Sequence, residues 1–208
     1  LVTVTNALRN IGIKNISLRC MYFPGGQQDR VANKGEALTS KVYADLINSQ
    51  AYTRVVIADN HSDVLPALIN NCEILDISPV IKKVLENYDT ILVPDAGAAK
   101  KIHNYYLKNI KWEGDIVQCL KTRDTKTGAL SGFQVLGQTN QIEDKRCVIL
   151  DDLAVGGGSF LGLASEINKY QPKSLGLYVT HGIFSNGLQC IFDHFDDIWT
   201  TNSKRSKA

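Results

Sequence analysis

A chain of 208 residues can form one large domain or two small ones and can bury a substantial core. Its 44% hydrophobic and 21% charged residues are ordinary for a globular protein, and a formal net charge of +2 argues against a nucleic-acid partner. No apolar run approaches the roughly 18 residues that span a membrane, so we expect no membrane partner and no signal peptide. Five scattered cysteines without a CxxC pair favour a reduced, cytoplasmic protein.

Hydrophobic periodicity predicts strands and helices that alternate along the chain. Apolar residues at helical spacing from Leu1 to Ile11 predict a first amphipathic helix, and because a domain rarely begins inside a helix, we expect the N-terminal domain to be incomplete. Apolar, β-branched runs predict strands at Ile16–Tyr22, Arg54–Ala58, Thr90–Val93, Asp115–Leu120, Cys147–Leu150 and Leu175–Thr180. Helical periodicity predicts helices at Gly35–Ser49, Val80–Tyr88, Ala96–Leu107 and Phe160–Tyr170.

This alternation is typical of α/β proteins with mainly parallel sheets covered on both faces. A turn at Ser78–Val80 predicts a division into two domains of related design, residues 1–79 and 80–208. The segment Leu130–Leu136, with glycines on both sides, is expected to form the arm of a hairpin.

Polar or glycine-rich segments follow four successive strands. They are ADNHSD (58–63), PDAGAAKK (94–101), KTRDTKTG (121–128) and DDLAVGGGS (151–159). In open α/β sheets, ligands bind outside the carboxyl ends of the strands. Four such segments at one edge therefore predict a single large polar site.

The last of these segments fits a sugar phosphate. Its glycines would let backbone N–H groups approach a phosphate at the start of a helix, and Asp151 and Asp152 could accept hydrogen bonds from a pair of ribose hydroxyls. The spacing matches neither the P-loop nor the dinucleotide-binding fingerprint. The alternative is purely architectural, a tight glycine turn with an acidic residue before a helix.

The other three segments carry charged candidates with equally plain alternatives. His61, between two aspartates, could contact magnesium or a polyphosphate, or be an ordinary loop histidine. Asp95 ends a buried strand, where a carboxylate is costly unless it is paired, hydrogen-bonded or bound to a metal. Lys121 and Arg123 begin a cationic segment that could bind phosphates or be a solvated loop.

Seven motifs follow one another along the chain: YFPGGQQDR (22–30), DNHSD (59–63), SPVI (78–81), PDAGAAKK (94–101), KTRDTKTG (121–128), DDLAVGGGSF (151–160) and VTHGIFSNG (179–187). In this order they resemble the ribose-phosphate diphosphokinase (PRPP synthetase) family, nearest to its short, divergent members from phage and bacterial NAD-salvage contexts. The resemblance implies two tandem type I phosphoribosyltransferase-like domains. Residues 1–79 would form the ATP side, and residues 80–208 the ribose-phosphate side with the catalytic loop.

The resemblance implies a Mg²⁺-dependent transfer of the β,γ-diphosphate of ATP to the anomeric hydroxyl of ribose 5-phosphate, giving PRPP and AMP. ATP would be bound by Gln27, Gln28, Asp29 and His61, and magnesium by His61 and Asp95. Lys121 and Arg123 would be catalytic and lie in a flexible loop, with Arg123 also contacting the ribose phosphate. The ribose phosphate would further be bound by Asp151, Asp152, Val155, Gly156, Gly157, Gly158 and Ser159. A homo-oligomer, dimer or hexamer, is implied because the family holds ATP between subunits.

Two motifs depart from the family's pattern. The phosphate loop reads VGGGS where the family has Asp-Thr-Gly-Gly-Thr, and Gly25-Gly26-Gln27 replaces Tyr-Ala-Arg. A phosphate loop that has lost a carboxylate could admit a larger acceptor, ADP-ribose, giving ADP-ribose pyrophosphate. A non-catalytic regulatory subunit is a second interpretation, against which the retained charged residues argue. A phosphoribosyltransferase that consumes PRPP is a third, against which the tandem units and the DNHSD motif argue.

Overall fold

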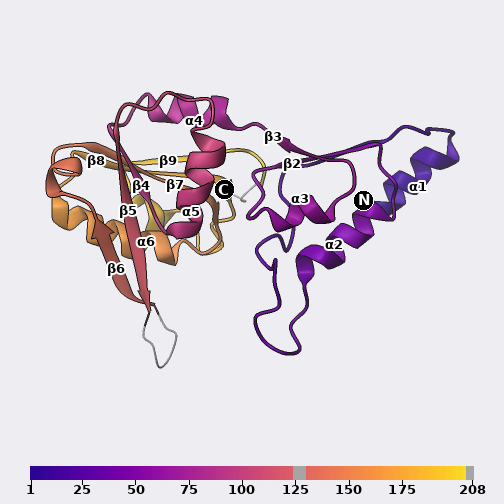
Figure 1. The fold of residues 1–208 in the computed structure, drawn as a ribbon, viewed down its shortest axis with the longest axis horizontal. Helices are drawn as coiled ribbons and strands as arrows, with labels where there is room; N and C mark the ends of the chain where they lie inside the picture. Colours follow the sequence, from indigo (N-terminus) through magenta and orange to yellow (C-terminus); the bar gives the residue numbers. More distant parts are fainter. Residues whose placement is uncertain (124–129, 205–208) are drawn as a thin grey trace. The chain divides into compact units, whose positions relative to one another are not determined.

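The computed structural model describes residues 1–123 and 130–204, with the backbone alone for Thr122, Arg123, Leu130 and Ser131. It divides into two compact units, Leu1–Asp76 and Ile77–Ala208, which are described separately (Figure 1). Each unit has its own sheet. Within the described ranges, no helix combines the length and the apolar character that crossing a membrane requires.

The first unit is built on a small parallel sheet in the order β1-β2-β3. Its elements are α1 (Val2–Asn10), β1 (Ser17–Cys20), α2 (Thr39–Asn48), β2 (Arg54–Ala58), α3 (Val64–Leu68) and β3 (Cys72–Leu75). The central strand β2 has the strongest apolar run, and its residues from Val55 to Ala58 are all buried. Ala44 and Ile47 of α2 and Leu65 of α3 belong to the same core.

The second unit is built on a six-stranded sheet in the order β6-β5-β4-β7-β8-β9. Its helices are α4 (Ser78–Leu85), α5 (Ala96–Lys101) with a π-helical turn (Ile102–Tyr106), α6 (Gly158–Ile167) and α7 (Gln189–Phe192). Its strands are β4 (Thr90–Val93), β5 (Asp115–Arg123), β6 (Leu130–Leu136), β7 (Arg146–Ala154), β8 (Ser174–Gly182) and β9 (Asp197–Thr200). All neighbouring strands are parallel except β5 and β6, which form the predicted hairpin arm (Figure 1).

Strand β7 is covered on both faces, which explains its unbroken apolar run. Cys147 and Ile149 belong to the core that contains α6, whereas Val148 and Leu150 belong to the core that contains α4 and α5. Successive side chains of a strand point to opposite faces, so this division follows from the strand geometry. The prediction of mainly parallel sheets with helices on both faces is confirmed for this unit.

Two strands extend past the residues where the apolar runs stop. β5 continues to Arg123 because β6 pairs with it, with Lys121 opposite Phe133. β7 continues to Ala154 because β8 pairs with it, with Asp151 opposite Val179. The prediction that Lys121 and the two aspartates follow their strands as loop residues is therefore wrong. A strand ends where its pairing ends, and pairing tolerates charged residues at the edge of the core.

Other differences are smaller. The Ser78–Val80 segment, predicted as a turn, is the first turn of α4, where Pro79 lacks an N–H that a helix start would not use. The helix expected over Ala96–Leu107 changes from α to π geometry at Ile102. The short helices α3 and α7 and the short strands β3 and β9 were not predicted. Each has only four or five residues, too few for a periodic signal.

Burial determines the acidity of three of the cysteine thiols. Cys20, Cys119 and Cys147, like the other two cysteines, are free thiols. Burial raises the pKa of Cys119 and of Cys147 to about 12 and that of Cys20 to about 11. These thiols stay protonated at neutral pH and act as small apolar side chains.

Candidate active site

Asp95 joins two strand ends in the second unit. It follows β4 as the N-cap of α5, and its Oδ1 accepts a hydrogen bond of 3.0 Å from the backbone N–H of Ala98. Its Oδ2 accepts a hydrogen bond of 2.8 Å from Nζ of Lys121, which stands near the end of β5. The ends of β4 and β5 are thereby connected through one charge-assisted contact.

This contact keeps Asp95 ionised. Burial, the largest influence, acts to raise the pKa of Asp95, but the Lys121 ammonium and the N–H groups of Ala98 and Gly97 together hold that pKa below its ordinary value. The Lys121 side chain is 23% exposed, so it lies near the surface and within reach of a ligand. The side chain of Arg123 and the segment 124–129 lie outside the described residues.

Asp151 and Asp152 lie near the carboxyl end of β7, the strand that pairs with β4. Asp152 is only 5% exposed, and its Oδ2 is 3.4 Å from Nζ of Lys101, the last residue of α5. The backbone N–H of Asp152 donates a hydrogen bond of 2.8 Å to Oδ1 of Asp151. The two carboxyl groups therefore differ: Asp152 is buried and ion-paired, whereas Asp151 is partly open to solvent.

Several influences raise the pKa of Asp151. Burial raises its pKa well above the ordinary value, followed by the charge of Asp152, a hydrogen bond between the two side chains and the charge of Asp95. In the sheet, β4 lies between β5 and β7, so the residues at its carboxyl end are flanked by those of the other two strands. The structure thus gathers the candidates at the ends of β4, β5 and β7 into one cluster: Asp95, Lys121, Asp151 and Asp152.

A glycine loop with a fixed shape leads from β7 into α6. Gly157 has φ of 81°, in the left-handed region that favours glycine, and a Cβ there would lie 2.4 Å from Cδ1 of Ile191. Val155 and Gly156 are held from the other side: their carbonyls accept hydrogen bonds from the backbone N–H of Ser185 at 2.8 Å and from Nδ2 of Asn186 at 3.2 Å.

The far end of this loop is open. Gly158 and Ser159 are exposed, and no heavy atom lies within 4 Å of the position that a Cβ on Gly158 would take. These residues begin α6, and the first N–H groups of a helix have no partner within it. The Val155–Ser159 segment therefore presents backbone donors and a positive helix end to solvent, an arrangement suited to an anion.

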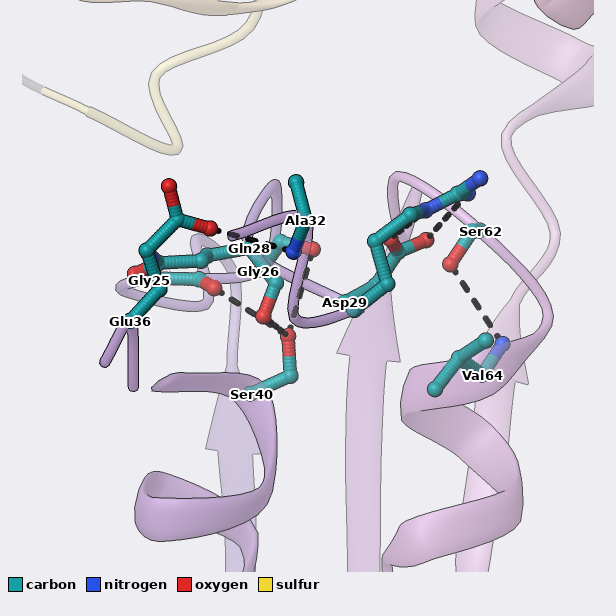
Figure 2. A network of polar contacts seen from close by, with 10 residues as sticks. Gly25, Gly26, Gln28, Asp29, Ala32, Glu36, Ser40, Ser62 and Val64 are labelled. Atoms are coloured by element: carbon teal, nitrogen blue, oxygen red, sulfur yellow. Dashed lines mark hydrogen bonds and ion pairs between the residues drawn. The ribbon is translucent and has the colours of Figure 1, made fainter. Parts of the chain in front are cut away.

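In the first unit, Ser40 fixes the loop that carries Gln27 and Gln28. Ser40 is fully buried, and its hydroxyl lies 3.1 Å, 3.5 Å and 2.8 Å from the carbonyl oxygens of Gly25, Gly26 and Gln28. Figure 2 shows this side chain pointing from the start of α2 into the loop. Gln27 and Gln28 remain exposed on the outside of the loop.

Asp29 links this loop to the DNHSD segment. It is buried and accepts a hydrogen bond from Nε of Arg30 at 2.8 Å (Figure 2). It also accepts a hydrogen bond from the side chain of Ser62. The hydrogen bond from Arg30, then that from Ser62 and the charge of His61, lower the pKa of Asp29 in spite of its burial. Asp29 thus has a structural place inside the unit, while His61 and the Arg30 guanidinium face solvent.

Sequence reasoning missed three polar residues of these sites: Ser40, Arg30 and Lys101. Arg30 belongs to the quoted motif QQDR and could have been identified from it. Lys101 ends PDAGAAKK, but two adjacent lysines are typical of a solvated helix end. Ser40 carries no signal of its own, since its role depends on carbonyls more than ten residues away.

The described residues fit a magnesium ion that is held by one carboxylate and completed by water and substrate phosphates. Within the described ranges, no group of three or more His, Cys, Asp or Glu side chains could hold a metal ion. Mg²⁺ commonly binds through one or two carboxylates, with waters and substrate phosphates completing its octahedron. Asp95, an ionised carboxylate at the strand edge, fits that arrangement, and His61 belongs to the other unit.

Comparison with known proteins gives one consistent relationship. No family model matches the chain. Ribose-phosphate pyrophosphokinase of Mycoplasmopsis pulmonis is 26% identical over an alignment of 213 positions, covering 98% of this chain and 64% of that protein. The enzyme of the same name from Corynebacterium glutamicum is 28% identical over 188 positions, covering 87% and 56%. The chain thus spans less than two thirds of the length of these curated relatives.

Among solved structures, the phosphoribosylpyrophosphate synthetase of Mycobacterium smegmatis superposes with a TM-score of 0.82 at 20% identity, covering 97% of this chain and 66% of that one. The fold is therefore the α/β fold of type I phosphoribosyltransferases, with two mainly parallel sheets of three and six strands. Over most of its length the chain is distantly similar in sequence to the ribose-phosphate pyrophosphokinases, also called PRPP synthetases.

Proposed function

We propose that this protein catalyses the Mg²⁺-dependent transfer of the β,γ-diphosphate of ATP to the anomeric hydroxyl of a ribose 5-phosphate acceptor. The observation that carries the proposal is the cluster at the ends of β4, β5 and β7, where Lys121 contacts Asp95 beside the Asp151–Asp152 pair. A purely architectural strand edge would not need four charged groups at a partly buried position. The sequence similarity to ribose-phosphate pyrophosphokinases points to the same reaction.

The proposed step is a displacement at phosphorus. The anomeric oxygen of the acceptor forms a bond to the β-phosphorus of ATP, and the bond from that phosphorus to the oxygen bridging the α- and β-phosphates breaks. AMP leaves with the bridging oxygen, and the hydroxyl proton is released. Such transfers depend mainly on positioning and on neutralising phosphate charge.

The residues of the second unit would divide these tasks. Lys121 would exchange its contact with Asp95 for the transferring phosphates, which frees the Asp95 carboxylate for Mg²⁺. The metal would neutralise the polyphosphate. The Val155–Ser159 segment would bind the 5-phosphate through backbone N–H groups, and Arg123 would add a second cation. Gln27, Gln28, Asp29 and His61 of the first unit are proposed for ATP, with Asp29 acting through the loop that it holds.

A larger acceptor is supported by the phosphate loop. Val155 stands where the family has a carboxylate, is 42% exposed, and is followed by glycines whose far end is open. A neutral, open loop would repel a second phosphate less than a carboxylate would. ADP-ribose, giving ADP-ribose pyrophosphate, is therefore the alternative acceptor. A regulatory subunit without turnover is the remaining candidate, and we further propose that the protein works as a homo-oligomer in the cytoplasm.

Release of AMP from ATP and Mg²⁺ tests the proposal with each acceptor in turn. AMP formed with ribose 5-phosphate identifies ordinary PRPP synthesis, and AMP formed only with ADP-ribose identifies the altered acceptor. The covalent product should carry a diphosphate on the anomeric oxygen by ³¹P NMR. Absence of AMP with both acceptors would refute the enzymatic proposal and leave the regulatory subunit.

A further inference from the structure

A buried lysine, Lys101, forms an ion pair with Asp152. Lys101 is 9% exposed and Asp152 is 5% exposed, and their charged groups are 3.4 Å apart. Removing either charge from water is costly, and a buried ion pair is often no more stable than apolar residues of the same size. Stability alone therefore gives little reason to keep a lysine and an aspartate at these two positions.

The Lys101–Asp152 ion pair is linked to Asp151, whose carboxyl group is partly open to solvent. Asp152 donates its backbone N–H to Asp151, and the two side chains share a hydrogen bond. Any displacement of Asp152 would therefore move Asp151. Lys101 reaches Asp152 from the end of α5, the same helix that Asp95 caps at its start. One short helix thus touches both halves of the charged cluster.

We propose that Lys101 is a positioning residue for the acceptor: it anchors Asp152 from the α5 side, so that Asp151 is the carboxyl that contacts the ribose hydroxyls. This inference rests on the proposed function. It replaces the expectation that both aspartates contact the sugar with a division of roles, one contact and one anchor.

The decisive variant removes both charges of the pair at once. Lys101→Met with Asp152→Asn leaves no uncompensated buried charge, so we expect a thermal midpoint close to that of the unmodified protein. The acceptor KM should nevertheless rise about 10-fold or more, because Asp151 loses its support. The KM for ATP should stay the same. The single variant Lys101→Arg keeps a cation beside Asp152, so its acceptor KM should stay close to that of the unmodified protein.

Lys83→Met is the matched control, since Lys83 lies exposed on α4 of the same unit. It should change neither KM. An unchanged acceptor KM in the double variant would overturn the inference. The inference would also be overturned if the acceptor KM rose only in proportion to a fall in the thermal midpoint, in both Lys101→Arg and the double variant. That result would indicate that the ion pair has a purely structural role.

Calorimetric titration of ribose 5-phosphate and of ADP-ribose into the unmodified protein separates this inference from the proposed function. If the unmodified protein neither binds an acceptor nor releases AMP, the proposed function fails and the inference fails with it. If the unmodified protein is active while the double variant binds its acceptor equally well, only the role of Lys101 is wrong.

Discussion

Lys121 illustrates how one side chain can change partner without changing the fold. Its ammonium lies 2.8 Å from Asp95 and near the surface. Partly exposed ion pairs of this kind contribute about 0.2–1 kcal/mol to stability. Against phosphates in a closed site, the same charge is worth much more. We therefore expect its contribution to catalysis to exceed its contribution to folding by a wide margin.

Lys121→Ala should lower kcat for AMP release by about 100-fold or more while leaving the thermal midpoint nearly unchanged. Initial-rate kinetics and thermal unfolding of the same preparation provide the measurement. Lys111→Ala, which removes an exposed lysine paired with Glu113, is the matched control and should leave kcat as it was. A fully active Lys121→Ala variant would remove Lys121 from the catalytic machinery.

The candidate site residues at the strand ends could be predicted from the sequence, whereas the residues that surround them could not. Asp95, Lys121 and the aspartate pair were predicted because parallel strands bring their carboxyl ends to one edge. That Asp152 is buried against Lys101 depends on where α5 ends relative to β7, a tertiary relation that no local pattern encodes. The same holds for Asp29, which the motif presents as a ligand and the structure buries against Ser62.

At the scale of elements, the start of α2 supports the glutamine-bearing loop of the first unit through Thr39 and through the backbone N–H and hydroxyl of Ser40. Ser40→Ala would remove the hydroxyl that lies within 3.5 Å of three loop carbonyls, at a cost of about 1–3 kcal/mol. We expect a lower thermal midpoint and, if the loop binds ATP, a higher KM for ATP. Ser49→Ala, at the exposed end of the same helix, should change neither quantity. An unaltered midpoint in Ser40→Ala would contradict the supporting role.

The glycine loop offers a pair of neighbouring substitutions with opposite expected effects. Gly157→Ala combines a left-handed φ with a contact to Ile191 at 2.4 Å, so the thermal midpoint should fall clearly. Gly158→Ala meets nothing within 4 Å and should not lower the midpoint. Its methyl group would instead crowd the proposed phosphate and raise the acceptor KM. Equal midpoints for the two variants would show that the loop is not held as described.

Element boundaries were the least predictable feature of the sheet. The bounds of β2 and β4 were predicted to the residue because both are short, apolar after their first residue and followed by polar segments. β5 and β7 outlast their apolar runs, since neighbouring strands continue to pair with them. The difference matters for the site, because it places Lys121 and the two aspartates on paired strands and not in loops.

At the scale of the whole molecule, an ion pair ties the amino ends of β4 and β7. Asp89 accepts hydrogen bonds from the backbone N–H of Arg146 and from its guanidinium at 2.7–3.0 Å. The hydrogen bond from the Arg146 side chain is the main reason that the pKa of Asp89 falls to about 2. An unfolded aspartate titrates near 3.9, so this stabilisation is present above about pH 4 and is lost as pH falls toward 2.

Asp89→Asn should therefore lower the thermal midpoint at pH 7, and its difference from the unmodified protein should shrink as the pH falls from about 4 to about 2. Both groups are partly exposed, so solvent screening keeps the effect modest. Glu113→Gln, at an exposed pair, should show no such closing difference. A gap that is constant with pH would mean that the carboxylate charge of Asp89 is not what stabilises the strand ends.

The charged groups at the two ends of β4 and β7 thus have different roles. At the amino ends, the ion pair of Asp89 and Arg146 connects the strands. At the carboxyl ends, Asp95 and the aspartate pair belong to the proposed acceptor site. An engineer could exchange residues around the glycine loop to admit new acceptors and leave the ion pair untouched. Substrate range and resistance to unfolding could then evolve, or be redesigned, one at a time on the same pair of strands.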